Sequence, residues 1–316
     1  MSETPADEGQ RGGGRRSRAG PLLVLGALIV GAIAVAVAYF ALFTRREQRS
    51  EPPPPAPPVV LTMAAAEGTV EVFRGGAWGP ARVGDRLEAS DRVRTGEDGQ
   101  ATLRLSDGSL VRLEAATETQ VQTLSRALSR IRLGGGGMQA DIADDPERLF
   151  QVDLDDEGAA ARTRGAAFGV TATSKGNAAV AATRGEVAVS ARGREVVLRS
   201  GQFTRVAPGA PPTDAAPLPA SLLLKVAWPG GEKGLVRATS AVVAGQTDPG
   251  SRIVVQGRHV AVDSEGRYRA EVTLREGANR VTVRARDVAG RQREERSPPI
   301  TVDTKTDFKV QVPRWK

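Results

Sequence analysis

Short runs of alternating apolar and polar residues fill most of the chain beyond residue 60 and predict β-strands. In residues 101–105 every second side chain is apolar, and residues 111–113 repeat this alternation after the pair Asp107-Gly108. An Asp-Gly pair favours a tight hairpin turn, because glycine adopts positive φ without steric cost. The pattern therefore predicts an antiparallel β domain over residues 61–207, either a sandwich or a short β-roll.

A second stretch of short strands covers residues 218–303. Apolar residues alternate from Leu222 to Val226, and polar turns are predicted at Asp248-Pro249-Gly250 and around Asp263. This spacing suits a β-sandwich. Residues 208–217, rich in Pro and Ala and without apolar periodicity, are predicted to link the two domains.

The end of the chain, residues 304–316, leaves two interpretations open. Phe308, Val310 and Val312 alternate with polar residues, so this tail is either one more strand or a frayed end.

An uninterrupted apolar segment occupies residues 21–43 and contains no charged residue. At about 1.5 Å per residue a helix of this length spans roughly 34 Å, enough for the hydrocarbon core of a bilayer. We therefore expect one transmembrane helix. Cleavage near Ala36-Val37-Ala38 is the alternative, although the apolar run is longer than a signal peptide usually carries.

The flanks of this segment suggest its orientation. Arginines lie on both sides, so the positive-inside rule alone does not decide. Residues 1–20 are rich in Gly, Arg and Ser and are predicted to be a disordered cytoplasmic tail, which leaves the folded domains on the other side. Residues 44–60 form a Pro-rich spacer, predicted to be a polyproline II stalk. Ala27 and Gly31 would permit helix pairing, so dimerisation stays open.

Composition excludes several classes of function. The chain has 316 residues and a net charge of +7, but its arginines are scattered rather than clustered, so we do not expect nucleic-acid binding. A basic surface facing anionic lipid or cell-wall polymer is the better interpretation. The absence of cysteine rules out a disulfide or a thiol nucleophile.

No combination of residues points to catalysis, a metal or a cofactor. The single histidine, His259, is predicted to be a surface side chain, because a general base or zinc site needs partners. The acidic residues between Asp141 and Glu157 do not have EF-hand spacing and are predicted to be solvated loops. Residues 134–137 are all glycine and are predicted to be a flexible turn. Trp78 and Trp228 are candidates for partner contacts, with packing as the plainer alternative.

The first domain contains ordered motifs of a known family. They include Val83-Gly84-Asp85, Arg164-Gly165-Ala166-x-Phe168 and Gly201-Gln202, and over about 145 residues the region resembles the periplasmic FecR-like domain of ferric-citrate-type regulators. The resemblance implies that the motif residues have structural or partner-binding roles. In this domain they are Gly68, Trp78, Gly84, Asp85, Thr95, Asp107, Gly108, Arg164, Gly165, Phe168, Gly185, Gly201 and Gln202.

Two departures limit what this resemblance implies. The family's Arg-Gly-Thr triplet ends here in Ala166, which loses a hydroxyl able to bond nearby backbone. Residues 1–20 are also too short and polar for the folded cytoplasmic domain of family members that control sigma factors. We therefore do not expect direct control of a sigma factor by this chain.

The second domain resembles bacterial immunoglobulin-like modules, which occur as accessory domains in surface proteins and polysaccharide-acting enzymes. The matching string begins at Val242 and ends at Gly290. The resemblance implies structural roles, in turns or packing, for Gly266, Tyr268, Gly277, Asn279, Asp287 and Gly290.

Together these features predict a bacterial inner-membrane, single-pass protein with two β domains in the periplasm and no activity as an enzyme. One hypothesis is a signalling role, in which the FecR-like domain binds an unidentified protein. The other is an envelope scaffold or adhesion protein, in which the immunoglobulin-like domain binds peptidoglycan or another polysaccharide. Both rest on architecture alone.

Overall fold

The structure, a computed structural model, describes residues 30–41, 59–154, 158–173, 176–231 and 234–304. The chain divides into two units, Met1–Pro57 and Pro58–Lys316. The predicted N-terminal tail, most of the Pro-rich spacer and the C-terminal residues from 305 onward lie outside the described residues.

The first unit contributes one described element, a helix over residues 30–41. This helix covers part of the transmembrane segment predicted for residues 21–43, and the remainder of that segment lies outside the described residues. Within the described ranges, no helix combines the length and the apolar character that crossing a membrane requires.

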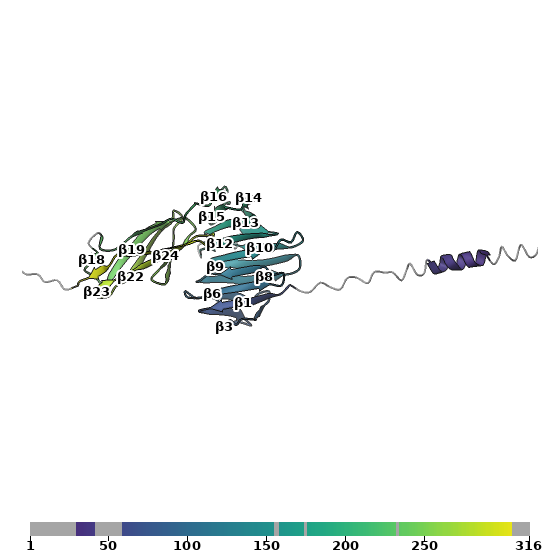
Figure 1. Ribbon diagram of the computed structural model, residues 1–316, viewed down its shortest axis with the longest axis horizontal. Coiled ribbons are helices and arrows are strands. Elements are labelled where there is room, and N and C mark those ends of the chain that lie inside the picture. The colour runs from purple at the N-terminus through teal and green to yellow at the C-terminus, as the bar shows by residue number, and fades with distance from the viewer. Residues whose placement is uncertain (1–29, 42–58, 155–157, 174–175, 232–233, 305–316) are drawn as a thin grey trace, which may run out of the picture. The chain divides into compact units, whose positions relative to one another are not determined.

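The second unit is mainly β, as the alternation predicts, and begins with a module of two sheet layers that we call the first module (residues 59–217). The strands of one layer, layer B, follow one another in hydrogen-bonded order as β3 (Ala77–Pro80), β2 (Val70–Arg74), β5 (Arg92–Thr95), β8 (Thr117–Leu124), β9 (Leu128–Ile142), β10 (Leu149–Asp153), β11 (Ala160–Thr163), β13 (Ala178–Ala191) and β14 (Arg194–Arg199). Figure 1 shows these strands stacked from β3 at one end to β14 at the other.

The other layer, layer A, uses the remaining strands together with the second half of β9 and the first half of β13. Its order is β4 (Arg86–Leu87), β1 (Leu61–Glu67), β6 (Gln100–Leu105), β7 (Leu110–Leu113), β9, β12 (Ala166–Ala172), β13, β15 (Gln202–Val206) and β16 (Ala216–Pro217). All pairs are antiparallel except β9 with β10 in layer B.

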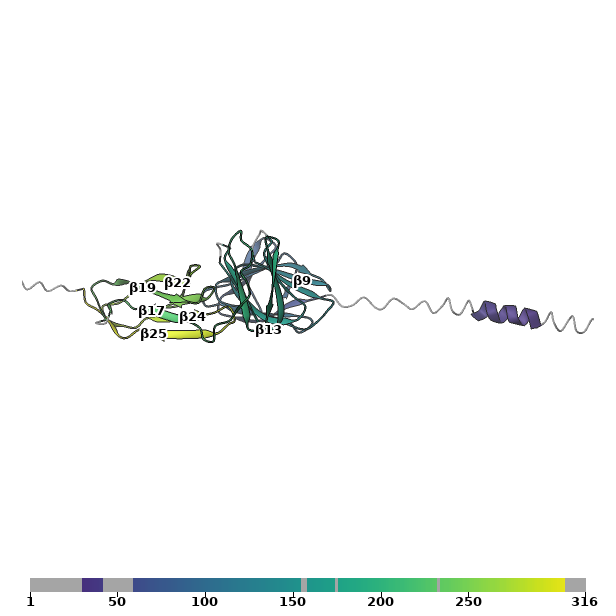
Figure 2. The ribbon, with the colours of Figure 1, turned by 90° about the horizontal axis from the view of Figure 1, so that it is seen from above.

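Strands β9 and β13 belong to both layers and tie them together; both are labelled in Figure 2. The first half of β9 pairs with β8 and β10, and its second half pairs with β7 and β12. The crossing falls at the glycine run, residues 134–137, so the prediction of a flexible turn there is wrong. Glycine suits this position because a strand bends sharply where it changes sheets, and Gly136 has φ +100.

The core of the first module lies between the layers. Apolar side chains of alternating residues face inward, as expected for strands with one buried face. Phe150 of β10 and Phe168 of β12 meet across the layers with ring centroids 6.3 Å apart, in an edge-to-face arrangement. Both side chains are fully buried. The predicted hairpin at Asp107-Gly108 is confirmed, with Gly108 at φ +91 between β6 and β7.

Residues 218–304 form the second module, three small sheets around one apolar core. The sheets are β17 (Leu224–Ala227), β19 (Ser240–Thr247) and β22 (Arg267–Thr273); β18 (Leu235–Val236), β26 (Ile300–Val302) and β23 (Gly277–Asn279); and β21 (Arg258–Val260), β20 (Arg252–Val255), β24 (Thr282–Arg286) and β25 (Gln292–Arg296). The predicted strands and turns are present, but assignment to the immunoglobulin-like class stays a prediction.

The segment between the modules lies along the first one. Strand β16, inside the predicted linker 208–217, pairs with β15, and Thr213 N donates to Arg205 O at 2.9 Å. Leu218 N then donates to Gly201 O at 2.8 Å. These bonds satisfy backbone groups that a free linker would leave to water.

Tyr268 shows how the second core is closed. Its ring is buried above Gly245, and its hydroxyl donates to Lys225 O at 3.1 Å. Burial raises its pKa to about 12. The folded state therefore resists loss of this proton, so stability is full below the ordinary tyrosine value of 10 and falls between 10 and about 12.

We expect the phenolate absorbance of a Tyr39→Phe chain, which keeps Tyr268 as its only tyrosine, to appear near pH 12. Appearance near pH 10 in the folded protein would contradict the burial of this hydroxyl. Tyr268→Phe should cost about 1 kcal/mol of unfolding free energy, because Lys225 O loses its donor.

Candidate functional site

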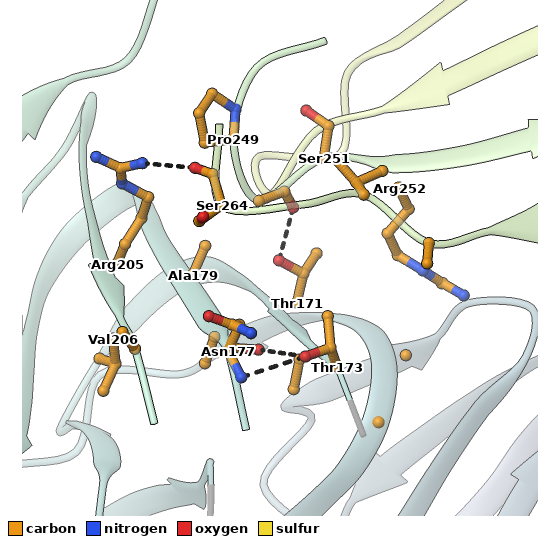
Figure 3. A pocket seen from close by; sticks show the side chains of 18 of the residues that line it. Thr171, Thr173, Asn177, Ala179, Arg205, Val206, Pro249, Ser251, Arg252 and Ser264 are labelled. Carbon is orange, nitrogen blue, oxygen red and sulfur yellow. Dashed lines mark hydrogen bonds between the residues drawn. The ribbon is translucent and has the colours of Figure 1, made fainter. Parts of the chain in front are cut away.

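The two modules meet at the outer face of layer A, where turns of the second module contact β12 and β13. Thr171 Oγ1 donates to Gly250 O at 2.8 Å, as the dashed line from Thr171 in Figure 3 shows. Val288, in the turn between β24 and β25, is buried against Ala179 and Ala181. We call this contact the junction.

Two glycines allow the modules to approach so closely. A Cβ on Gly169 would lie 1.7 Å from Val288 O, a backbone atom of the other module. A Cβ on Gly250 would lie 2.7 Å from the Cβ of Ala179, and φ of Gly250 is +87. Glycine within a strand often marks such an approach of two backbones.

A buried carboxylate holds the junction together. Glu114, at the end of β7, has a side chain only 5% exposed and lies between two arginines of the second module. Arg252 Nη1 is 3.1 Å from Glu114 Oε2, and Arg286 Nε is 3.2 Å from Oε1. Gln139 Nε2 is 3.4 Å from Oε1 and 3.2 Å from Val288 O. The negative charge of Glu114 is therefore balanced by an arginine on each side, as burial of a charge requires.

Arg252 is the centre of this group. Besides Glu114, its Nη2 donates to Ala115 O at 2.6 Å. Burial lowers the pKa of Arg252, and the nearby Glu114 carboxylate opposes that shift. The guanidinium remains charged because an arginine pKa starts above 12.

His259 completes the junction, and the prediction that it is a surface side chain is wrong. Its side chain is 19% exposed, with Nδ1 3.4 Å from Arg252 Nη2 and Nε2 3.8 Å from Glu97 Oε2. Its backbone N donates to Glu97 Oε2 at 2.9 Å. Since arginine only donates, Nδ1 must accept, which makes Nε2 carry the proton of a neutral ring.

The pH dependence of the junction follows from this arrangement. Burial, and then the charge of Arg252, lower the pKa of His259 below 6.5, while Glu97 opposes them. As the pH falls, the unfolded chain binds a proton before the folded one, so the contribution of His259 is full above 6.5 and declines below it.

We expect the ring resonances of this single histidine to titrate below pH 6.5 in a nuclear magnetic resonance experiment. The stability of the wild-type chain should fall with acid more steeply than that of His259→Asn. A titration midpoint at or above 6.5 would contradict the partly buried, neutral state.

Beside the junction lies a groove of about 700 Å³, lined by both modules. Part of it is drawn in Figure 3, with Thr173 and Asn177 of the first module and Pro249 and Ser264 of the second. Most of the side chains in its lining are alanine, valine, proline or threonine. A groove of this size and lining is a common form of binding site.

The residues singled out from the sequence lie mostly elsewhere and serve turns. Eight of these residues are glycines with positive φ, a conformation that only glycine adopts freely. They are Gly68, Gly84, Gly108, Gly185, Gly201, Gly266, Gly277 and Gly290. Gly290 also touches the junction, since its Cβ would lie 3.3 Å from Gln139.

The polar motif residues bond to the backbone or to neighbouring charges. Asp85 accepts from Arg82 N, Gln202 from Arg199 N, Asn279 from Arg275 N and Asp287 from Arg291 N. Thr95 Oγ1 donates to Glu114 O, and Arg164 Nη1 donates to Pro146 O. Asp107 accepts from Ser109 and pairs with Arg148. Their contacts are structural.

The remaining candidates also pack. The Arg94 guanidinium lies 4.1 Å from the Trp78 ring centroid, and Trp228 packs against the second core. Gly165 leaves room for Asp144, because a Cβ at this position would lie 1.9 Å from the Asp144 side chain.

Of the acidic residues expected to be solvated, Asp153 is instead buried and paired with Arg130. Within the described ranges no cluster of His, Cys, Asp or Glu could hold a metal ion.

Sequence reasoning missed the residues that build the junction. Glu114, Gln139 and Arg252 look like ordinary surface charges and amides in the sequence. Gly169 did carry a signal, because it lies between Phe168 and Val170 inside a strand, where glycine indicates close backbone approach.

Comparison with known proteins supports one of the two resemblances. The sequence model of the FecR protein family matches residues 91–188, inside the first module. The model of glucodextranase domain B matches residues 226–305, which cover most of the second module. A search of curated proteins finds no match. The first module is therefore FecR-like.

Solved structures show only distant likeness. Two crystal structures of a provisionally assigned anti-sigma factor from Parabacteroides distasonis are 20% and 19% identical, each with a TM-score of 0.36. Each match covers 41% of this chain and 60% of that one, so this chain spans less than two thirds of their length. A polysaccharide lyase is 13% identical with a TM-score of 0.19, over 76% of this chain and 40% of that one. Scores this low carry no argument about function.

Proposed function

We propose that this chain is a membrane-anchored, non-catalytic FecR-domain protein that binds a protein partner in the periplasm and takes part in signalling. The observation that carries the proposal is the match of residues 91–188 to the FecR family. The groove beside that module, formed jointly with the second module, supplies a place for the partner.

Two further features support the proposal. The helix over residues 30–41 lies within residues 21–43, an apolar run without a charged residue, as expected of a helix that crosses lipid. His259, the one histidine of the chain, is engaged by Arg252 and Glu97 in the junction, so a structural role accounts for it.

The test is crosslinking of the tagged, full-length protein in intact cells, followed by membrane solubilisation and mass spectrometry. Recovery of one specific protein, lost when Glu114→Ala disrupts the junction but kept in Glu186→Ala, would support the proposal. Glu186 is the matched control because its carboxylate is 64% exposed and pairs only at the surface with Arg199. Recovery of no specific protein would overturn it.

A second candidate is an envelope scaffold that binds polysaccharide through the second module. The match of residues 226–305 to glucodextranase domain B favours it. In this case capture should depend on intact cell wall, and the purified protein should sediment with peptidoglycan. If the protein sediments equally well with and without peptidoglycan, this candidate fails.

A further inference from the structure

Both modules contribute aliphatic side chains to the lining of the groove. The first module contributes Ala172 and Ala178 and the second contributes Pro249, Val260 and Val262. Among the described residues, no phenylalanine, tyrosine or tryptophan lines the groove. Because buried apolar surface is the main source of affinity in such sites, this lining favours a ligand with small aliphatic groups.

Four threonine hydroxyls around the groove are already engaged, whereas the buried Ser251 Oγ has no partner among the described residues. Thr95 donates to Glu114 O, Thr117 to Gly137 O, Thr171 to Gly250 O and Thr173 to Asn177 O. A glycan would lose water from each buried hydroxyl and find few free partners in return. These threonines therefore offer a polysaccharide little, and the aliphatic part of the lining favours a ligand with apolar groups.

Backbone is open to a ligand at the glycine run. Strand β8 pairs Glu118 with Gly135 and Thr119 with Leu133, which leaves Gly134 without a Cα partner in the register. Gly134 is exposed, and its missing Cβ would meet only Glu118 O, at 3.6 Å. A residue left out of a ladder in this way presents peptide groups that another chain can bond.

The positively charged side chain of Arg205 lies at the edge of the groove. Arg205 is exposed and donates to Ser264 O at 3.3 Å, as Figure 3 shows. Its neighbour Asp263 is engaged by Arg267, with Nε 2.8 Å from Oδ2. Within the described ranges no carboxylate forms an ion pair with Arg205. Its remaining N–H groups suit a carboxylate of a ligand.

We propose that this groove binds an extended polypeptide segment that places small aliphatic side chains on the groove lining and a carboxylate at Arg205. A polypeptide is the class that supplies aliphatic side chains, backbone hydrogen bonds and a carboxylate together. The inference rests on the proposed function, because it describes the segment of the partner that is recognised.

The experiment uses the full-length protein in nanodiscs and two pools of octapeptides, randomised over Ala, Val, Leu and Ser, with Glu or Lys fixed at one end. Bound peptides are identified by mass spectrometry. We expect the Glu pool to be enriched roughly tenfold over the Lys pool, and Arg205→Gln to remove this preference.

Gly134→Val should abolish the enrichment, because it fills the groove at a position where a Cβ meets no close neighbour. Gly79→Val is the matched control, since Gly79 lies in strand β3 with nothing within 4 Å of its missing Cβ. Equal enrichment by Gly134→Val and by the wild type would overturn the inference. A second result would also overturn it. In that result no peptide is enriched, but chitotriose or laurate binds to the wild type and not to Gly134→Val.

The in-cell crosslinking experiment separates the two proposals. If Gly134→Val still captures the partner found with the wild type, the proposed function stands and the groove is not its recognition site. If no variant captures a partner but peptides bind the groove, the groove inference stands and the signalling role fails.

Discussion

Replacing Gly169 with alanine is expected to separate the two modules. The new Cβ would stand 1.7 Å from Val288 O, and because that atom is backbone, no change of rotamer can relieve the overlap. The turn that carries Val288 must withdraw, which also breaks its bond with Gln139. Overpacking of this kind costs roughly 3 kcal/mol.

The measurement is thermal unfolding of the full chain together with limited proteolysis. We expect the wild type to unfold with the two modules coupled, and Gly169→Ala to show two transitions and faster cleavage between residues 207 and 222. Gly79→Ala is the control, because its Cβ meets nothing within 4 Å, and it should change stability by less than about 0.5 kcal/mol. Unchanged coupling in Gly169→Ala would mean that the junction does not form as described.

Glu114→Ala is expected to have an effect of similar size for an electrostatic reason. It would leave Arg252 and Arg286 close together without their shared carboxylate, and the side chain of Arg252 is only 14% exposed. Removing one partner of a buried ionic group costs about 3 kcal/mol or more. We expect Glu114→Ala to reduce the coupling of the modules.

Glu186→Ala again provides the control, since an exposed pair is worth at most about 1 kcal/mol. Replacing Glu114, Arg252 and Arg286 together by apolar residues should restore part of the lost stability, because no charge then remains buried without a partner. If Glu114→Ala behaves like Glu186→Ala, the charged group does not hold the modules together.

Both variants should also weaken peptide binding in the groove, since each module supplies one side of it. They differ in their response to pH. In the fraction of Glu114→Ala whose modules stay in contact, Arg252 lies beside His259 without the Glu114 carboxylate, so protonation of His259 should become harder still. Gly169→Ala, which separates the modules, should return His259 toward its ordinary pKa.

The strands could be predicted because each carries its own signal. Alternation along β6 and β7 fixes which face is buried, and the Asp107-Gly108 pair fixes the turn between them. The same reasoning failed at residues 134–137, because a glycine run fits a loop as well as a strand crossing between sheets. Only pairing on both sides, with β8 and then with β12, makes it a strand.

His259 and Glu114 were beyond sequence reasoning for a different reason. Each is polar, lies near a turn and has an oppositely charged partner far away in the sequence. Their partners, Glu97 and Arg252, are 162 and 138 residues away. Whether a charged side chain is buried depends on which distant residues pack over it, and the local sequence does not predict those residues.

The sequence by itself determined the strand pattern, the positions of the turn glycines and the FecR-like character of the first module, because these depend on side-chain periodicity and on backbone conformation at single residues. The tertiary structure alone decided that the modules form a junction and share a groove. That outcome depends on two surfaces fitting each other, Gly169 against Val288 and Glu114 between two arginines, and complementarity between distant segments leaves no periodic trace in either.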